Sequence, residues 1–238
     1  GYTVLFGTNS TYAIAPNILQ SLSYDNDKAF APVGLVLRSP QMLCVSPAFP
    51  VNTVPELLDH VQKHPSNEVN FASAGPGSTS HMAMELLMSI AQIRMQHVPY
   101  RGGAPALQAL MSGEASVGFV DLSTALPVAK SGMLRMLAAS TAERSALQPN
   151  LPTIAETVPG FQSTTDVSCF VPAGTPDPAI QRLSAAIKTA FKLPQVTKPL
   201  LEAGLILVAG TPEEFPQYFA EERAKWRKLI ETQNIKLQ

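Results

Sequence analysis

The chain has 238 residues, of which 45% are hydrophobic and 15% are charged, and its formal net charge is −1. This length suits one large domain or two smaller ones, and the hydrophobic share is enough for a sizeable core. The near-neutral charge excludes nucleic acid and anionic membrane surfaces as expected partners, and no apolar run reaches the roughly 18 residues that direct membrane insertion requires.

The first 45 residues predict short strands separated by polar turns. A strand over residues 2–6 has no basic segment of a signal peptide before it. Because the chain opens inside structure, we expect a further segment upstream. A polar turn over residues 7–11 leads into a short helix near 13–19, and a loop follows over 23–30. Strands are expected over 32–37 and 42–45, separated at Ser39-Pro40 because proline breaks the ladder of hydrogen bonds.

The next stretch reads as helix, strand, glycine turn, helix and strand. Thr53 and Glu56 predict a capping box for a helix over 54–64. A buried strand over 69–72 must end at the turn Ser-Ala-Gly-Pro-Gly of residues 73–77. Ser78, Thr79 or Ser80 then caps a helix. Its expected apolar face is Met82, Leu86, Ile90 and Ile93. A strand ending near Val98 closes the unit.

This strand, glycine turn and helix start predict an anion site. The first N–H groups of a helix lack partners within it, and the helix dipole adds partial positive charge there. The bound anion is either a carboxylate or a phosphate. The turn lacks the Gly-Lys-Ser/Thr of a P-loop and the G-x-G-x-x-G spacing of a dinucleotide site. A plain, well-capped strand-to-helix turn explains the same residues equally well.

The second half continues the alternation of strands and helices. Helices are expected over 104–111, ended by Gly113, and from Ser123 to about 131. Strands are expected over 117–120 and 134–139, with a loop over 141–160 that holds a short helix at 154–157. A strand over 167–171 precedes helices over 177–192 and 194–203. A strand over 205–208 leads to a last helix, which Thr211 and Glu214 cap and which runs to about 233.

This alternation predicts an α/β fold with mostly parallel sheets flanked by helices. Ligands in such folds bind beyond the carboxyl ends of the strands. Polar turns follow Phe6, Ala72, Pro99 and Val120 at such ends, so we expect them to contribute to one cleft.

Candidate catalytic and metal-binding residues have simpler alternatives. Ser78 and Ser80 lie near His81, but no G-x-S-x-G elbow is present, and a hydrolase-like use of Ser80 or Ser78 stays the alternative function. His60 and His64 have the spacing of a metal pair but no third ligand nearby, so no metal and no cofactor is expected. Asp121 and Arg101 have two readings each. Asp121 is a base or a helix cap. Arg101 pairs with a ligand carboxylate or forms a salt bridge.

Cys44 and Cys169 both lie in apolar, strand-like runs. Two cysteines are too few for a disulfide scaffold and lack the spacing of metal ligands. We expect two buried thiols, with a single disulfide as the alternative.

Several motifs in consecutive order resemble one family along the whole chain. They are GYT-x-L-x-GT-x-x-T-x-A-I, FAPVGLV, NFASAG-x-GS-x-SH, HVPYRGGAPAL, the pair Arg144-Ser145, LPTIAE, VPAGTP and TPEEF. The chain resembles the Bug (TctC-like) family, the solute-binding proteins of tripartite tricarboxylate transporters. The resemblance implies a periplasmic protein without catalytic activity or cofactor, which binds a small organic carboxylate and interacts with the membrane components of its transporter.

The resemblance also implies a two-domain periplasmic-binding-protein clamshell (Venus flytrap). Domain 1 would comprise residues 1–40 and 166–238, and domain 2 residues 41–165. Family members carry a strand-helix-strand unit before the residues that match Gly1, so this unit is expected to be missing here. Asp166 would lie near the hinge and meet a ligand hydroxyl or amine. The ligand-binding residues implied are Thr8, Asn9, Ser10, Thr11, Ser73, Gly75, Gly77, Ser78, Thr79, His81, Arg101, Asp121 and Asp166.

Overall fold

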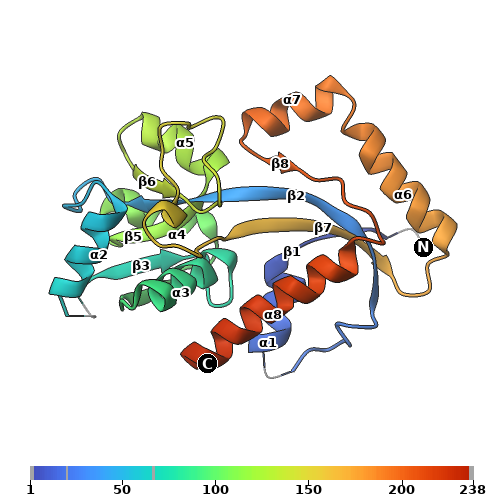
Figure 1. Ribbon diagram of the computed structural model, residues 1–238, viewed down its shortest axis with the longest axis horizontal. Coiled ribbons are helices and arrows are strands. Elements are labelled where there is room, and N and C mark those ends of the chain that lie inside the picture. The colour runs from blue at the N-terminus through green and yellow to red at the C-terminus, as the bar shows by residue number, and fades with distance from the viewer. Residues whose placement is uncertain (1–2, 20, 66–67, 236–238) are drawn as a thin grey trace. The chain divides into compact units, whose positions relative to one another are not determined.

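The computed structural model describes residues 3–19, 21–65 and 68–235. The chain forms two compact units, one of residues 1–39 with 165–238 and the other of residues 40–164. We call them unit 1 and unit 2. Strand β2 (Phe30–Val45) carries the chain from unit 1 into unit 2, and β7 (Thr164–Pro172) carries it back (Figure 1). Each unit is an α/β arrangement: unit 2 is built on the last part of β2, and unit 1 on the first part of β2 and nearly all of β7.

Unit 2 is built on a sheet in the order β2-β5-β3-β4, with β6 also paired to β2. The partner strands are β3 (Asn70–Ser73), β4 (Gln96–Pro99), β5 (Val117–Asp121) and β6 (Arg135–Ala139). Strand β3 runs parallel to β4 and β5, whereas β2 runs antiparallel to β5 and β6. The carboxyl ends of β3, β4 and β5 consequently lie at the same edge of the sheet.

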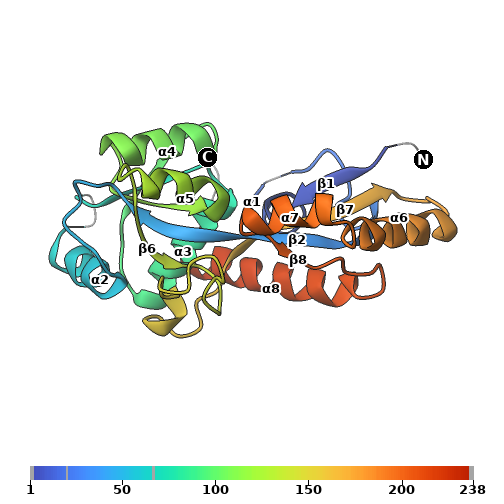
Figure 2. The ribbon, with the colours of Figure 1, turned by 90° about the horizontal axis from the view of Figure 1, so that it is seen from above.

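Helices cover both faces of this sheet because side chains alternate between faces along each strand. Leu43, Phe71 and Phe119 face α2 (Val54–Lys63) and α3 (Thr79–Ala91). Met42 and Val120 face the opposite way, towards α4 (Gly103–Ser112) and α5 (Leu122–Lys130). Figure 2 shows α4 and α5 on one side of the sheet and α2 and α3 on the other. A short 3-10 helix, η2 (Ile154–Glu156), adds Ile154 to the first of these cores.

Unit 1 pairs β1 (Leu5–Thr8) with β7, places β7 beside β2, and adds the short β8 (Ile206–Leu207) to β2. After β1, a π-helical turn η1 (Ser10–Ile14) continues into α1 (Ala15–Ile18). These pack against the long helix α8 (Phe215–Gln233). The ring of Tyr12 contacts Phe170, Phe215 and Phe219 at centroid distances of 5.2, 6.0 and 6.0 Å.

The remaining helices of unit 1 are α6 (Asp177–Ala190) and α7 (Pro194–Glu202). The helical spacing expected for Ile180, Leu183, Ile187 and Phe191 is confirmed. Ile180 is buried in a core with Val33, Val36, Cys169 and Val171, and the other three pack against that core.

The expectation of mostly parallel sheets was wrong. In the described chain, the pairings β1–β7, β2–β5, β2–β6 and β2–β8 are antiparallel, whereas β3–β4 and β3–β5 are parallel. Alternation of strands and helices gives consecutive strands a common direction, but they form a parallel pair only when they lie in neighbouring positions of the sheet. Strands β5 and β6 flank helix α5 and run in the same direction, but β2 lies between them and runs the opposite way.

The expected break at Ser39-Pro40 was also wrong, because β2 continues through it for 16 residues. Pro40 lies between Arg38, which is paired with β8, and Gln41, which is paired with β5. Proline is tolerated in a strand where its missing N–H is not needed by a neighbouring strand. The strand expected over 2–6 is β1, displaced to Leu5–Thr8, and Tyr2 lies outside the described residues.

The predicted helix ends are mostly confirmed. The side chain of Thr53 accepts a hydrogen bond from the Glu56 N–H, although the Glu56 carboxylate accepts from Asn52 rather than from Thr53. Gly113 ends α4 with a φ of 80°. Thr211 and Glu214 form the expected reciprocal bonds, but regular helix begins only at Phe215.

The buried face of α3 differs from the expected one. Met82 is buried, but Ile90 is 37% exposed and Ile93 lies beyond the helix, while Met84, Leu87 and Met88 form the packed face. Ile93 is nevertheless buried in the same core and Leu86 packs against it, so Ile90 is the residue of the expected face that lies away from the core.

Both cysteines are buried free thiols, as expected. Burial raises the pKa of the Cys169 thiol to about 11 and also raises the pKa of the Cys44 thiol.

Candidate functional site

A cavity of about 470 Å³ lies in unit 2 beyond the carboxyl ends of β3 and β5. This is the position at which ligands bind in α/β folds. The lining residues come from the strand ends, the first turns of α3 and α4, and α5. They are Gln41, Ala72, Ala74, Thr79, Ser80, Gly103, Ala104, Ala106, Leu107, Gln108, Leu110, Met111, Phe119, Val120, Asp121 and Thr124.

Two helices begin at this cavity. Thr79 and Ser80 are the first two residues of α3, and Gly103 and Ala104 are the first two of α4, and all four line the cavity. The N–H groups at these positions have no acceptor within their own helix. Helix α4 is preceded by Gly102, which has no side chain to cap it. The cavity wall therefore combines two helix N-termini, which attract negative charge.

The turn before α3 satisfies its own hydrogen bonds. The N–H groups of Ala74, Gly75 and Gly77 donate to Ser80 Oγ, Ser73 Oγ and His81 Nδ1 at 3.0, 3.1 and 3.1 Å. Ser78 Oγ accepts from the His81 N–H at 3.3 Å and so acts as the helix cap. Because these donors are already used, the turn shapes the cavity, and the first two residues of α3 contribute to its lining.

Three stacked aromatic rings pack beside the glycine turn of residues 73–77. His81 and His97 stack with centroids 4.1 Å apart, and His97 stacks on Phe71 at 4.8 Å. His97 Nε2 lies 2.6 Å from Ser73 Oγ. Burial, followed by the proximity of His81, lowers the pKa of His97 to about 4. Neutral His97 can therefore accept the Ser73 hydroxyl proton in a hydrogen bond and keep the turn in place.

The structure brings together only some of the site residues predicted in unit 2. Thr79 and Asp121 line the cavity. Ser73, Gly75, Gly77, Ser78 and His81 form the turn and its support rather than the cavity lining. Arg101 is exposed, and in the described part of the chain it is neither in the lining nor in a recorded ion pair.

Gln41 is a cavity residue that sequence reasoning missed. It lies on β2 directly opposite Asp121 of β5, so both side chains point to the same face of the sheet. Gln41 is 2% exposed, and its Nε2 lies 3.5 Å from Thr79 Oγ1. A polar residue at the centre of an apolar run was the signal available in the sequence. Only the strand register shows that it faces the cavity.

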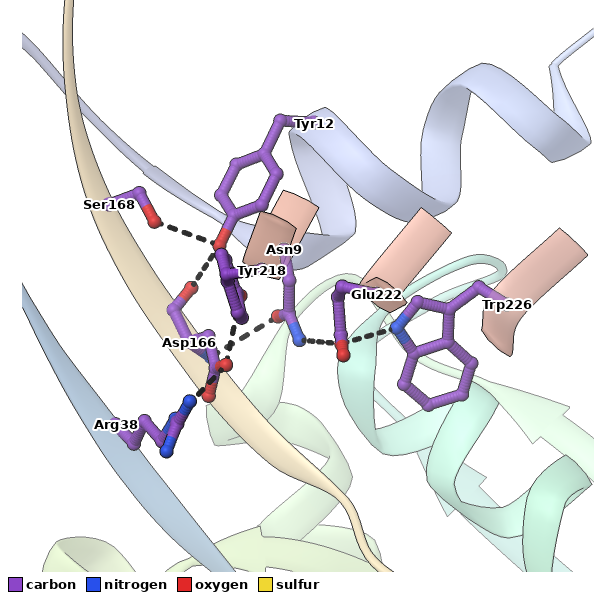
Figure 3. Close-up of polar contacts among 8 residues, drawn as sticks. All are labelled: Asn9, Tyr12, Arg38, Asp166, Ser168, Tyr218, Glu222 and Trp226. Carbon is purple, nitrogen blue, oxygen red and sulfur yellow. Dashed lines mark hydrogen bonds and ion pairs between the residues drawn. The ribbon is translucent and has the colours of Figure 1, made fainter. Parts of the chain in front are cut away.

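Asn9 and Asp166 belong to a buried polar network within unit 1 (Figure 3). Asn9 is fully buried, its amide donates to Glu222 Oε1 at 2.9 Å, and its oxygen accepts from the Asp166 N–H at 3.3 Å. Trp226 Nε1 donates to the same Glu222 oxygen at 2.6 Å. The network therefore ties the start of η1 to β7 and α8.

The Asp166 carboxylate is 3% exposed and has protein partners in this network. Its Oδ2 accepts from Tyr218 at 2.9 Å and lies 3.4 Å from Arg38 Nε. The Tyr218 hydroxyl also lies 2.9 Å from that of Tyr12, which accepts from Ser168 at 3.0 Å. Burial, with the nearby Asp166 charge, raises the pKa of Tyr218, so its hydroxyl stays protonated as a donor.

The other residues predicted near β1 have different surroundings. Thr8 ends β1, and its hydroxyl lies 2.6 Å from that of Ser10. Thr11 is exposed at the rim of a second, largely aromatic cavity of about 350 Å³ within unit 1.

The sheet with helices on both faces, and a cavity at the carboxyl ends of its strands, define an α/β protein of the binding-protein class. The family model for tripartite tricarboxylate transporter family receptors matches residues 1–235. The chain belongs to this family, the TctC/Bug family of periplasmic solute-binding receptors. No helix within the described ranges is both long and apolar enough to cross a membrane.

Curated relatives match most of the chain. A protein from the tcbD-tcbE intergenic region of Pseudomonas sp. (strain P51) is 32% identical over 233 residues, which cover 97% of this chain and 68% of the relative. BugT of Bordetella pertussis is 27% identical, with 100% of this chain and 73% of the relative covered.

Solved structures agree with the fold. An R. palustris protein solved with adipate is 30% identical and superposes with a TM-score of 0.92. The match covers 99% of this chain and 79% of the R. palustris chain. MatC from Rhodopseudomonas palustris with bound malate is 30% identical and superposes with a TM-score of 0.86. The match covers 96% of this chain and 79% of the MatC chain.

This family is one of binding proteins and not of enzymes, so the hydrolase alternative was wrong. The serine contacts agree with this: Ser78 Oγ donates to the Gly75 carbonyl at 2.6 Å, and Ser80 Oγ accepts from Ala74. The serine beside an imidazole is Ser73, which is 1% exposed. His60 and His64 stack at 4.0 Å, and within residues 3–19, 21–65 and 68–235 no group of three potential metal ligands occurs.

We predict that Gly75→Ala weakens ligand binding. Gly75 has a φ of 118°, and a Cβ there would meet the Tyr100 carbonyl oxygen at 3.2 Å. The strain costs about 1–2 kcal/mol and moves the turn beside the cavity. The control is Gly132→Ala, at a φ of 77° with nothing within 4 Å of the added Cβ. Calorimetric titration should show weaker binding for Gly75→Ala alone, and equal affinities would contradict a role for the turn.

We predict that His97 makes the protein less stable in mild acid. Its pKa falls from 6.5 to about 4 on folding. A group whose pKa is lower in the folded state stabilises the fold above its unfolded pKa. This contribution to the free energy of unfolding is at most about 3 kcal/mol, and it is lost as the pH falls from 6.5 to about 4. Urea unfolding at pH 7 and pH 4.5 should show a smaller pH dependence for His97→Asn than for the natural protein. Gln217→Asn, at an exposed position of α8 and without a titratable side chain, should leave the dependence unchanged.

We predict that Tyr218→Phe destabilises the fold by about 1–3 kcal/mol, because it leaves the buried Asp166 carboxylate without one of its donors. Tyr24→Phe is the matched control, since no hydrogen bond of the Tyr24 hydroxyl occurs among the described residues. Urea unfolding measures both. Equal effects would show that the Tyr218 hydroxyl adds nothing beyond ring packing.

Proposed function

We propose that the solute is a small organic carboxylate and that it binds in the unit 2 cavity. The observation that carries this proposal is that the first two residues of both α3 and α4 line one cavity. The positive ends of two helix dipoles at one cavity favour a compact anion with several acceptor oxygens.

The rest of the lining argues for a carboxylate with a carbon skeleton. Ala106, Leu107, Leu110 and Phe119 provide an apolar wall next to the helix starts. Lysine and arginine, which bind phosphate groups in many proteins, do not occur among the residues that line the cavity. The similar R. palustris structures solved with adipate and with malate support the same ligand class.

We further propose that units 1 and 2 act as the two lobes of a periplasmic-binding-protein clamshell, with the domain boundaries where β2 and β7 cross. The protein would deliver its solute to the membrane components of a tripartite tricarboxylate transporter. Membership of the receptor family supports this partner.

A first test is a thermal shift measurement with adipate, malate and succinate, each beside its neutral diamide. Binding stabilises the folded protein by about 2.7 kcal/mol at a ligand concentration one hundred times the Kd. We expect at least one carboxylate to raise the melting temperature while its diamide does not. Equal shifts for acid and diamide would show that the charge is not recognised.

A second test places a competing charge at the helix starts. Ala104 is exposed and lies in the first turn of α4, where an added carboxylate stabilises the helix by about 0.3–1 kcal/mol. Ala104→Asp should therefore keep the fold but weaken carboxylate binding at least about tenfold through like-charge repulsion.

Ala104→Asn is the matched neutral control and should retain most of the affinity. Calorimetric titration of both variants distinguishes charge from size. Unchanged affinity in Ala104→Asp would place the ligand's carboxylate elsewhere.

A further inference from the structure

One part of the unit 2 cavity wall, beside the start of α3, carries hydrogen-bond acceptors. Gln41 and Asp121 are cross-strand partners of β2 and β5, and both line the cavity. Directly opposed residues of an antiparallel pair hold their Cβ atoms roughly 5 Å apart on the same face. An amide and a carboxylate are thus placed side by side at one end of the cavity.

The backbone of Gln41 is fixed while its side chain has few bonds. The Gln41 N–H donates to Ser140 Oγ at 3.0 Å, and the Gln41 carbonyl accepts from the Ser140 N–H at 2.8 Å. The amide Nε2 reaches Thr79 Oγ1 only at 3.5 Å, the outer limit of a hydrogen bond. The amide oxygen is buried and has no hydrogen-bond partner among the described residues.

A buried amide oxygen without a donor is unusual and costly, and it points to a group that binds there. Gln41 is one of the residues that line the cavity. The terminal torsion of glutamine is soft, so the amide can turn its oxygen towards a ligand without moving the fixed backbone.

Asp121 adds charge to the same end of the cavity. It occupies the N-cap position of α5, but its side chain does not cap that helix. It is the charged residue among those lining the cavity. A carboxylate accepts several hydrogen bonds at once, so a ligand donor can join the contacts that Asp121 already makes. A second ligand carboxylate would be repelled here.

We propose that Gln41 and Asp121 form an acceptor pair that selects a carboxylate carrying a hydroxyl or ammonium group. This rests on the proposed function: the ligand's carboxylate lies at the starts of α3 and α4, and its donor group faces β2 and β5. The Gln41 amide oxygen accepts a hydrogen bond from the ligand's hydroxyl or ammonium group, and the Asp121 carboxylate attracts a positive charge.

The test compares ligands that differ by one group. Succinate lacks a donor, malate adds a hydroxyl, and aspartate adds an ammonium. Calorimetric titration of the natural protein should show at least one enantiomer of malate or aspartate binding about tenfold or more tightly than succinate, the ratio that one well-made hydrogen bond supplies. Equal or tighter binding of succinate would overturn the proposal and would indicate that the amide presents its NH₂ group to a second carboxylate.

Substitutions at Gln41 and Asp121 test whether these residues cause the preference for malate or aspartate over succinate. Gln41→Met keeps the length of the side chain but removes the acceptor, so the malate-to-succinate ratio should fall towards one. Asp121→Asn should weaken aspartate more than malate. Gln217→Met, on the exposed face of α8, is the control and should leave the ratio unchanged.

The outcomes separate this proposal from the proposed function. If no carboxylate of the panel binds, the proposed function fails. If carboxylates bind but the natural protein does not prefer those with a donor, only the selection by Gln41 and Asp121 fails. A ratio that survives Gln41→Met also overturns it. The ratio in the natural protein decides the matter even if Gln41→Met lowers the melting temperature.

Discussion

The parallel pairing of β3 with β4 and β5 is the constraint on which the unit 2 cavity depends. It places the carboxyl ends of these strands at one edge of the sheet, and the helices that follow β3 and β4 start at that edge. Two helix N-termini thereby share one cavity without any lysine or arginine in its lining. Such a site attracts negative charge through backbone dipoles, whose positions are set by the fold rather than by flexible side chains.

Around that cavity, residues divide into those that shape the wall and those that face the interior. The glycine turn of residues 73–77 bonds mostly to itself and rests on the stacked rings of His81, His97 and Phe71. The residues that hold this turn are therefore structural residues of the site, namely Ser73, Ser78, His81 and His97. In the site we propose, a ligand is recognised by the two helix starts, the apolar wall of α4, and the acceptors on β2 and β5.

Unit 1 shows the opposite use of polar groups. Asn9, Asp166 and Glu222 come from three distant parts of the sequence and meet in one network, in which Asn9 and Asp166 are buried. Buried polar groups are stable only when their hydrogen bonds are satisfied, and here tyrosine, tryptophan and arginine side chains supply the donors. The network holds η1, β7 and α8 together, which gives two residues expected at the ligand a role in the fold.

The sequence by itself determined the local structure. Glycines with positive φ at 75 and 77, the Ser78 cap, the Gly113 stop and the apolar spacing of α6 all follow from short-range chemistry. It also determined the family, because consecutive motifs in the right order are specific. It placed Thr79 and Asp121 near one another because both follow strands of an α/β pattern.

Strand order and register were decided only by the tertiary structure. The sequence pattern did not reveal that β2 passes through Pro40 unbroken, or that it inserts between β5 and β6 and makes most of the pairings antiparallel. Neither did it show that Gln41 faces Asp121. Which strands become neighbours depends on long-range packing of the two helix layers, and a shift of one residue in register would turn Gln41 to the other face of the sheet.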